Sequence, residues 1–240
     1  MHDAEPVVRR ERVIRDALMD SDVFGALEEE EIDKLALCGQ TLHYEAGRTI
    51  FQKGDPGDSL MVVVSGRVKI GTLSTDGREA VLNYVGPCQS FGEIALLDGK
   101  PRSADATAVE ATELFVLRRR DVLSFVERHP DIALRIMGML CARLRYTTEM
   151  LEDHLTVDMA TLLARALLRL SRIYGQNCAE GIRIELPLSQ RELGSIVGLS
   201  RENVNRHLSD WRGRGILRLD QRRITICRPE ALVAIAAGGR

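Results

Sequence analysis

The segment between Ser90 and Ala104 carries side chains suited to an anionic ligand that also bears hydroxyl groups. It opens with a glycine and Glu93, continues through an apolar EIALL stretch that predicts a short helix, and returns through a glycine and a proline to Arg102 and Ser103. The start of a helix exposes backbone N–H groups that attract anions. Arg102 can close on the same phosphate with its planar fork, Ser103 can add a hydroxyl or amide bond, and Glu93 can accept from a ribose 2′-hydroxyl. The segment therefore indicates a sugar-phosphate site; the alternative is an Arg–Glu salt bridge on a surface turn.

A second segment, LPLSQRELGSIVGLSRENVNRHLSDWRGRGIL, has the form of a helix-turn-helix. Ser189 begins a helix, and Glu192 three residues later completes a capping box. Gly198 supplies the tight turn, and Ser200 begins the second helix. The apolar residues of the second helix share one face, which predicts its buried side: Val204, Leu208 and Trp211.

The opposite face of this second helix presents Arg201, Glu202, Asn205 and Arg206 near its start. These are the positions at which a recognition helix meets base edges in the major groove. Arg can form two hydrogen bonds to guanine with its planar guanidinium, and Glu can accept a hydrogen bond from the cytosine amine. The run GILRLDQRRITI then predicts a hairpin, or wing, whose arginines at 222 and 223 can contact DNA phosphate. The alternative is an ordinary helix pair with a polar surface.

Between these segments, residues 131–153 predict one long helix. Its apolar or small residues alternate four and three apart, as in the seam of a two-stranded coiled coil; the predicted seam is Ala133, Met137, Leu140, Leu144, Thr147 and Leu151. A second stripe of Ile132, Ile136 and Met139 can pack on a neighbouring domain. Thr147 and Thr148 place hydroxyls where a coiled coil prefers Leu or Ile, which indicates that a polar partner is held there. The alternative is a buried helix of an ordinary globular core.

The elements around this helix differ on its two sides. Residues 9–19 and 28–37 predict helices, and residues 41–118 form short β-rich runs broken by turns such as Ser65-Gly66, Asp76-Gly77 and Gly86-Pro87. This rhythm predicts a small antiparallel barrel or sandwich. After the long helix, residues 157–174 predict an amphipathic helix and residues 181–186 a strand.

The distribution of charged residues also changes at the long helix. From Asp153 onward there are 14 Arg against 9 Asp and Glu, a net charge of +5, and every positive side chain is Arg. The whole chain carries −2, so residues 1–152 carry −7. Because Arg supplies all the positive side chains of this half, the half is suited to contacts with phosphate and guanine.

The sequence disfavours a zinc protein, a membrane or secreted protein, and an enzyme with a common nucleotide-binding or nucleophile motif. The five cysteines are scattered without a C-x-x-C pair, which predicts reduced thiols and no zinc site. Apolar runs are too short for a membrane span, and the N-terminus is charged where a signal peptide is apolar, so a cytoplasmic protein is expected. Walker-type and Gly-x-Ser-x-Gly motifs of enzymes do not occur.

The runs GDPGDSLMVVVSGRVKI and FGEIALLDGKPRSA resemble the cyclic-nucleotide-binding domain of catabolite-activator-type regulators and cyclic-nucleotide-dependent kinases. The phosphate-binding cassette of that domain has the form FGE-small/apolar-AL-x-x-G-x-PR-small-A, and this sequence aligns with it without a gap. The resemblance implies that Gly92 and the following amides, those of Ile94 and Ala95 included, hold the cyclic phosphate with Arg102 and Ser103. Glu93 would then hold the ribose hydroxyl.

The later segments are similar to the same family, the CRP/FNR superfamily of its catabolite-activator type. VGLSRENVNRHL resembles its recognition segment, G-small-SRE-x-V-x-R, which implies a TGTGA-type half-site. RLRYTTEM resembles the stretch whose hydroxyls contact the adenine, Thr147 within its own subunit and Thr148 across the dimer. The DNA-binding set implied by the match comprises Ser189, Gln190, Ser200, Arg201, Glu202, Asn205 and Arg206, with the two serines on phosphates.

The expected fold is α+β: an antiparallel, jelly-roll-like β-barrel with N-terminal helices in residues 1–129, a dimerisation helix in 130–155 and a winged helix-turn-helix in 156–240. The expected function is a homodimeric transcription regulator in which cyclic AMP favours the DNA-binding form, with RNA polymerase as a further partner and no metal. Cyclic GMP is the first alternative effector. Cyclic AMP is favoured over it because a threonine often follows the cassette arginine in cyclic-GMP-selective kinase domains, whereas this chain has Ser103. Another effector, or none, on the same scaffold is the next alternative, although the cysteine cluster of iron–sulfur sensors is absent and axial ligands for haem are not evident. An enzyme is the least favoured alternative.

Overall fold

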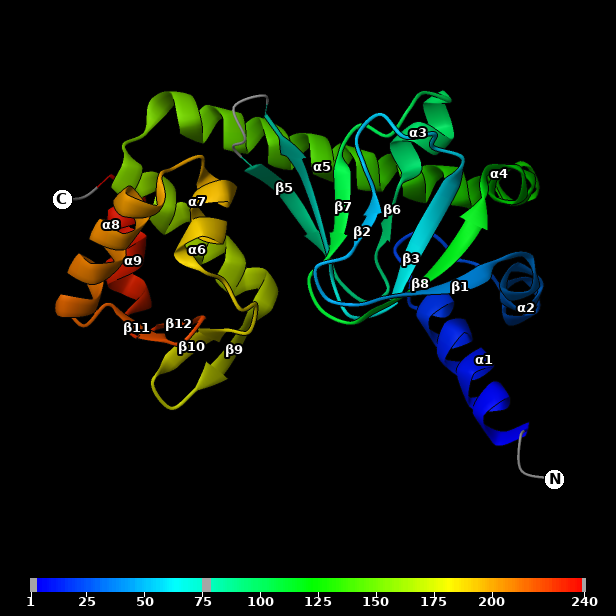
Figure 1. Ribbon diagram of the computed structural model, residues 1–240, viewed down its shortest axis with the longest axis horizontal. Coiled ribbons are helices and arrows are strands. Elements are labelled where there is room, and N and C mark those ends of the chain that lie inside the picture. The colour runs from blue at the N-terminus through cyan, green and yellow to red at the C-terminus, as the bar shows by residue number, and fades with distance from the viewer. Residues whose placement is uncertain (1–3, 75–78, 239–240) are drawn as a thin grey trace. The chain divides into compact units, whose positions relative to one another are not determined.

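A computed structural model of the chain describes residues 4–74 and 79–238, with side chains described from residue 11 onward (Figure 1). The predicted turn at Asp76-Gly77 lies outside the described residues. Contacts divide the chain into two compact units. The first comprises the residues up to Leu73 together with Leu82–Tyr146, and the second comprises Ser74–Val81 together with the residues from Thr147 onward. The boundaries predicted from the sequence, at residues 129 and 155, remain a prediction.

The first unit begins with helices α1 (Ala4–Met19) and α2 (Glu29–Cys38), close to their predicted positions. Eight short strands follow in two four-stranded sheets, of orders β1-β8-β3-β6 and β2-β7-β4-β5. The strand pairings described within them are antiparallel, which confirms the antiparallel β-domain. The strands are β1 (Gln40–Tyr44), β2 (Thr49–Phe51), β3 (Ser59–Ser65), β4 (Val68–Leu73), β5 (Glu79–Val85), β6 (Ser90–Phe91), β7 (Asp105–Ala108) and β8 (Thr112–Arg118).

Strand β3 shows why its sequence, SLMVVVS, is apolar without alternation. Leu60 and Val62 pack in a core with the helices, whereas Met61 and Val63 pack in a second core with residues of both sheets. Successive side chains of a strand point to opposite faces, and here both faces are covered. The strand pairs with β6, so this doubly covered strand supports the start of the segment from Ser90 to Ala104.

Helix α3 (Glu93–Asp98) is inserted between β6 and β7 and is the short helix predicted from EIALL. Glycines flank it in the left-handed region, Gly92 at φ +88° and Gly99 at +69°. A Cβ at Gly92 would lie 2.6 Å from Arg102 Nη1 and 3.0 Å from the Ser59 carbonyl oxygen. Glycine at 92 is thus required by both conformation and space.

Helices α4 (Arg119–Arg128) and α5 (Pro130–Thr156) follow. The predicted second stripe on α5 is confirmed, since Ile132 and Ile136 are buried in the core beneath α1 and α2 and Met139 packs against it. The predicted coiled-coil seam is partly wrong, because Ala133 and Leu140 are partly buried and Leu140 also packs against that core. The exposed stripe instead repeats three and four apart through Leu134, Met137, Cys141, Leu144, Thr148, Leu151 and Leu155.

The second unit contains helix α6, which confirms the helix predicted after the long one, followed by hairpins and three further helices. Its sheet has the order β11-β12-β10-β9. The elements are α6 (Met159–Tyr174), β9 (Gly175–Cys178), β10 (Gly181–Ile184), α7 (Gln190–Val197), α8 (Arg201–Gly213), β11 (Leu217–Asp220), β12 (Arg223–Ile226) and α9 (Pro229–Ala236). The helix-turn-helix and its wing are as predicted; β9 and α9 were not predicted. Among the described residues, no helix is long and apolar enough to cross a membrane.

Candidate functional site

A cavity opens beside α3 in the first unit and encloses about 50 Å³. Six of the residues that line it are the six cassette residues predicted to bind ligand, and the others come from β2, β4, β6, α5 and the residue before β7. The complete lining is Phe51, Ile70, Phe91, Gly92, Glu93, Ile94, Ala95, Arg102, Ser103, Ala104 and Arg143.

Arg102 is 4% exposed and is held in place from several sides. Its Nη1 donates to the carbonyl oxygens of Ser59 (2.9 Å) and Gly92 (3.0 Å), and its Nη2 donates to Ser59 Oγ (2.8 Å). The guanidinium lies 4.3 Å from the centre of the Phe51 ring. These bonds use three of its five N–H donors. Its Nε is buried without a hydrogen-bond partner in the described structure, so an anion can be bound by a guanidinium that is already positioned.

The electrostatic setting of Arg102 favours an anion. Burial lowers the pKa of Arg102, and the nearby carboxylates of Asp58, Glu93 and Asp55 partly oppose that shift. An arginine remains protonated in proteins even so. A buried guanidinium therefore presents a fixed positive charge where water screens it little.

Glu93 is 1% exposed, and its two oxygens differ. Oε1 accepts from Arg143 Nη1, whereas Oε2 is buried without a partner in the described structure. An unsatisfied buried acceptor costs about 1–3 kcal/mol, more when charged. Since both Glu93 and Arg102 are buried, a salt bridge on a surface turn does not describe them.

Arg143 is the polar residue of the cavity lining that the sequence did not predict. It comes from α5, donates through Nη2 to the Ser90 carbonyl oxygen at 2.5 Å, and pairs with Glu93 through Nη1. Ligand pockets usually have volumes of about 300–1,000 Å³. The polar groups of this cavity suit a sugar phosphate, and its present volume is smaller than that of a typical ligand pocket.

Thr147 and Thr148 lie further along α5 and are exposed. Thr147 is four residues after Arg143 and therefore one turn along the same helix face. Contacts place both threonines in the second unit. Their predicted contact with the base is taken up below as a proposal.

The helix-turn-helix of the second unit is capped as predicted. Ser189 Oγ accepts from the Glu192 amide at 3.2 Å, and Glu192 Oε2 accepts from the Ser189 amide at 2.7 Å. Gly198 ends α7 at φ +64°. Ser200 Oγ accepts from the Asn203 amide at 3.3 Å. Each serine uses its oxygen as an acceptor, which leaves the hydroxyl proton for a phosphate.

Helix α8 has the two faces expected of a recognition helix. Val204, Leu208 and Trp211 are buried, which confirms the inner face. The predicted readers are all exposed on the other side: Arg201, Glu202, Asn205 and Arg206.

Gln190 at the start of α7 reaches across to α8. Its Nε2 donates to Asn205 Oδ1 at 2.9 Å, and Ser209 Oγ donates to the same oxygen at 3.4 Å. This assignment leaves the Asn205 amide nitrogen to donate outward. Gln190 is therefore a positioning partner of Asn205 in addition to lying in the predicted DNA-binding set.

The wing is tied to α7. Arg222 Nη2 lies 2.7 Å from Glu192 Oε2, the oxygen that also completes the capping box, and Arg223 pairs with Glu185. Burial raises the pKa of Glu192, but the hydrogen bonds from Ser189 and Arg222 together outweigh it, so the pKa lies below its ordinary value. The phosphate contacts predicted for both wing arginines would have to share or replace these exposed ion pairs. Among the described residues, no cluster of His, Cys, Asp and Glu is arranged to hold a metal ion.

Family models match both units. Residues 41–129 match the model of the cyclic nucleotide-binding domain, and residues 163–235 match that of the Crp-like helix-turn-helix domain.

Individual relatives match across nearly the whole chain. A CRP-like cAMP-activated global transcriptional regulator from Mycobacterium tuberculosis is 34% identical over 90% of this chain and 96% of its own length. The cyclic AMP receptor protein of Thermus thermophilus is also 34% identical, over 91% and 98%. The solved structure of the c-di-GMP responsive global regulator CLP from Xanthomonas campestris superposes with a TM-score of 0.73 at 25% identity, covering 83% of this chain and 99% of that one.

Proposed function

The chain belongs to the CRP/FNR family of transcription regulators, and on that premise we propose that it is a cyclic-AMP-responsive homodimer that binds a TGTGA-type palindrome. The family is not enzymatic, and the chain combines a cyclic nucleotide-binding domain with a Crp-like helix-turn-helix. Nucleotide would act by binding the DNA-competent form more tightly than the other form. This activity would take place in the bacterial cytoplasm, with RNA polymerase as a further partner.

The observation that carries this proposal is the pair of unsatisfied buried atoms in one cavity, Arg102 Nε and Glu93 Oε2. One is a donor on a fixed cation and the other an acceptor on a carboxylate. A cyclic nucleotide offers the matching groups, an anionic phosphate and a ribose hydroxyl donor. Ser103 and the backbone at Gly92, Ile94 and Ala95 would complete the phosphate contacts.

Arg143 would connect the bound ligand to α5. It pairs with the carboxylate that would receive the ribose hydroxyl, so the ribose and Arg143 would share or compete for Glu93. Thr147, one turn further along α5, would contact the base, and Thr148 would contact the nucleotide of the partner subunit. Binding would then change the contacts of α5, which is the element proposed to form the dimer.

The dimer would form along the exposed stripe of α5. Its residues repeat three and four apart over Leu134 to Leu155, which is the spacing of a parallel coiled coil. Leu134, Leu144 and Leu155 are 62%, 68% and 76% exposed in the single chain. A second copy of α5 would bury these leucines and place Thr148 in the seam.

Cyclic AMP is favoured over other effectors. Both relatives described above carry cyclic AMP in their names, and Ser103 stands where cyclic-GMP-selective kinase domains often have threonine. The second candidate is the same scaffold with another nucleotide, because the structurally similar regulator CLP is described as c-di-GMP responsive.

Thermal unfolding with and without ligand tests the proposal. Purified protein is melted alone and with cyclic AMP, cyclic GMP or cyclic di-GMP, and a ligand that binds only the folded form raises the Tm. Glu93→Gln should lose most of the shift with cyclic AMP, while the exposed Glu127→Gln should keep it. Stabilisation by another nucleotide alone would select the second candidate, and stabilisation by none of them would reject a nucleotide effector.

A further inference from the structure

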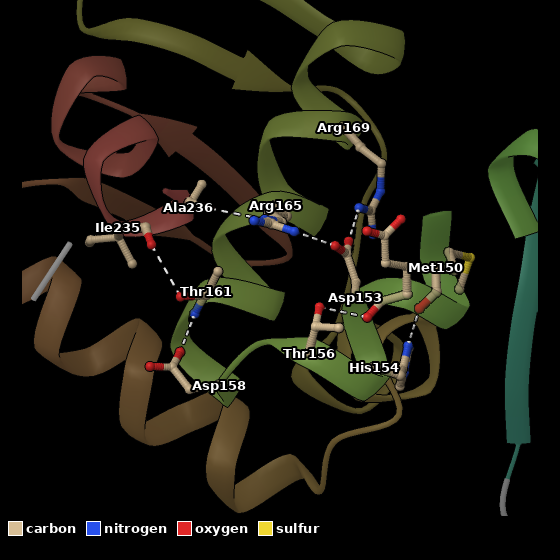
Figure 2. Close-up of polar contacts among 11 residues, drawn as sticks. Met150, Asp153, His154, Thr156, Asp158, Thr161, Arg165, Arg169, Ile235 and Ala236 are labelled. Atoms are coloured by element: carbon tan, nitrogen blue, oxygen red, sulfur yellow. Dashed lines mark hydrogen bonds and ion pairs between the residues drawn. The ribbon is translucent and has the colours of Figure 1, made fainter. Parts of the chain in front are cut away.

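The last turn of α5 is bound to the DNA-binding unit by a buried carboxylate. Asp153 is 6% exposed, and its two oxygens accept from Arg165 Nη1 at 2.5 Å and Arg169 Nη1 at 2.9 Å (Figure 2). Both arginines belong to α6. A carboxylate shared by two guanidiniums fixes the position of its helix more firmly than one exposed ion pair.

Arg165 extends this attachment to α9. Its Nε donates to the Ala236 carbonyl oxygen at 2.9 Å, and Thr161 Oγ1 donates to the Ile235 carbonyl oxygen at 3.2 Å. Figure 2 shows both bonds reaching the end of α9 from α6. These carbonyls lie in the last turn of α9, where a cation is favourable. Asp153 is therefore linked through one arginine to two helices of the second unit.

The next residue attaches the same turn to the helix-turn-helix. His154 Nε2 lies 3.1 Å from the Val197 carbonyl oxygen, and Nδ1 lies 2.7 Å from that of Met150. Both partners are acceptors, so a neutral ring donates to one of them at a time. A Cβ at Gly198 would lie 2.9 Å from His154 Nε2, so the imidazole packs directly on the turn between α7 and α8.

The connection between α5 and α6 is short and partly bonded. Only Val157 and Asp158 separate the two helices. The Val157 amide donates to the Asp153 carbonyl oxygen at 3.2 Å, and Asp158 caps α6 by accepting from the Thr161 amide at 2.8 Å. These two residues would be the natural place for a pivot, but the clamp formed by Asp153, His154, Arg165 and Arg169 spans them.

We infer that Asp153 and His154 are positioning residues that make the last turn of α5 one rigid body with the recognition helix. A movement of α5 on nucleotide binding is then transmitted to α8, because residues 157–158 do not act as a flexible pivot. This inference rests on the proposed function, because nucleotide is the signal that the clamp passes on. All the residues of the clamp lie within the second unit.

The coupling between nucleotide and DNA tests the inference. Fluorescence anisotropy gives the Kd for a TGTGA palindrome with and without cyclic AMP, and their ratio measures the coupling. Asp153→Asn should lower this ratio by about tenfold, and His154→Ala by a smaller factor. Intrinsic nucleotide affinity and binding to DNA of random sequence should stay within about twofold, since the residues proposed to contact either ligand do not include the clamp.

Matched variants separate positioning from general damage. Glu152→Gln removes an exposed carboxylate from the same turn and should leave the ratio unchanged. Asp153→Glu keeps the charge and should restore part of the ratio lost in Asp153→Asn. Arg169→Gln combined with Asp153→Asn should lose less than the product of the single effects, because both remove one interaction. An unchanged ratio in Asp153→Asn would overturn the inference.

Hydrogen exchange on the full-length, ligand-free protein gives a readout that does not depend on nucleotide. Amides of residues 153–158 should be protected as strongly as those of α7 and α8 in the wild type, and Asp153→Asn should accelerate their exchange while α8 keeps its protection. Fast exchange of residues 153–158 in the wild type would overturn the clamp. A wild type without any cyclic AMP response would instead reject the proposed function, and exchange alone would then decide whether the clamp exists.

Discussion

The cavity beside α3 and helix α8 both carry arginines that we propose bind phosphate or base, but they place these arginines differently. Arg102 is 4% exposed and already bound to three protein oxygens, whereas Arg201 and Arg206 are exposed on α8. Buried charge is screened little by salt, and exposed charge is screened strongly. In the proposed function, a small ligand would be bound by a few fixed buried groups, and DNA would be bound by exposed side chains on a helix.

The difference predicts that changes in the cavity affect folding and binding together, whereas changes on α8 affect binding alone. A buried arginine also supports the backbone at Ser59 and Gly92. An exposed arginine on α8 has no such role. Four measurements test this contrast, beginning with the largest expected effect.

Arg102→Lys should lower nucleotide affinity by at least about 100-fold and also lower the Tm. Lysine keeps the charge but cannot reproduce the planar fork, and each hydrogen bond to a charged group contributes about 1.5–3 kcal/mol. Isothermal titration with cyclic AMP and thermal unfolding give the two values. The exposed Arg128→Lys is the control. Affinity within a few-fold of the wild type would show that Arg102 is a structural residue only.

Arg201→Ala should weaken binding to the palindrome by about 10- to 100-fold, because a bidentate base contact is worth about 1–3 kcal/mol. The Tm and the nucleotide affinity should not change. A gel shift at two salt concentrations measures the loss, and Arg214→Ala at the end of α8 is the matched exposed control. Equal losses in both variants, or equal loss on random DNA, would indicate contact with phosphate in place of base reading.

Thr148→Ala joins the two regions through α5 and should have a smaller effect. A neutral hydrogen bond contributes about 0.5–1.5 kcal/mol, so the nucleotide response should fall by about 2- to 10-fold. Dimerisation, measured by analytical ultracentrifugation, should fall less, since the leucines of the exposed stripe remain. Equal losses in response and dimerisation would favour a plain coiled coil without a ligand contact.

The smallest effect concerns pH and the second unit. Burial lowers the pKa of His207, as does Arg206, with Asp158 and Asp210 opposing. The folded state therefore favours the neutral ring, and the stability from this group is complete above the ordinary pKa of 6.5 and is lost as pH falls through the lowered value. Thermal unfolding between pH 7.5 and 5 should show a shallower decline in His207→Gln. A decline in His207→Gln that runs parallel to that of the wild type would contradict the assignment.

Local signals explain most of what was predicted. The cassette residues meet in one cavity because Gly92, Glu93, Arg102 and Ser103 lie within a single turn-helix-turn segment. The caps of α7 and α8 form because their donors and acceptors are three residues apart. Strand β9 and helix α9 were missed: GQNC has little apolar content, and PEALVAIA is a short segment near the end of the chain.

Long-range packing decided the rest. Arg143 meets Glu93 across 50 residues of sequence, and Ser59 meets Arg102 across 43, separations at which no spacing rule operates. The seam of α5 illustrates the same point, since two sets of residues satisfied the three-and-four repeat, and the partial burial of Ala133 and Leu140, with the packing of Leu140 on the core, distinguished them. The sequence by itself determined the residue types, the local turns and the helix caps, because these depend on neighbours in the chain. The tertiary structure decided which stripe of α5 is exposed and which distant side chains share a cavity, because both depend on the packing of the whole fold.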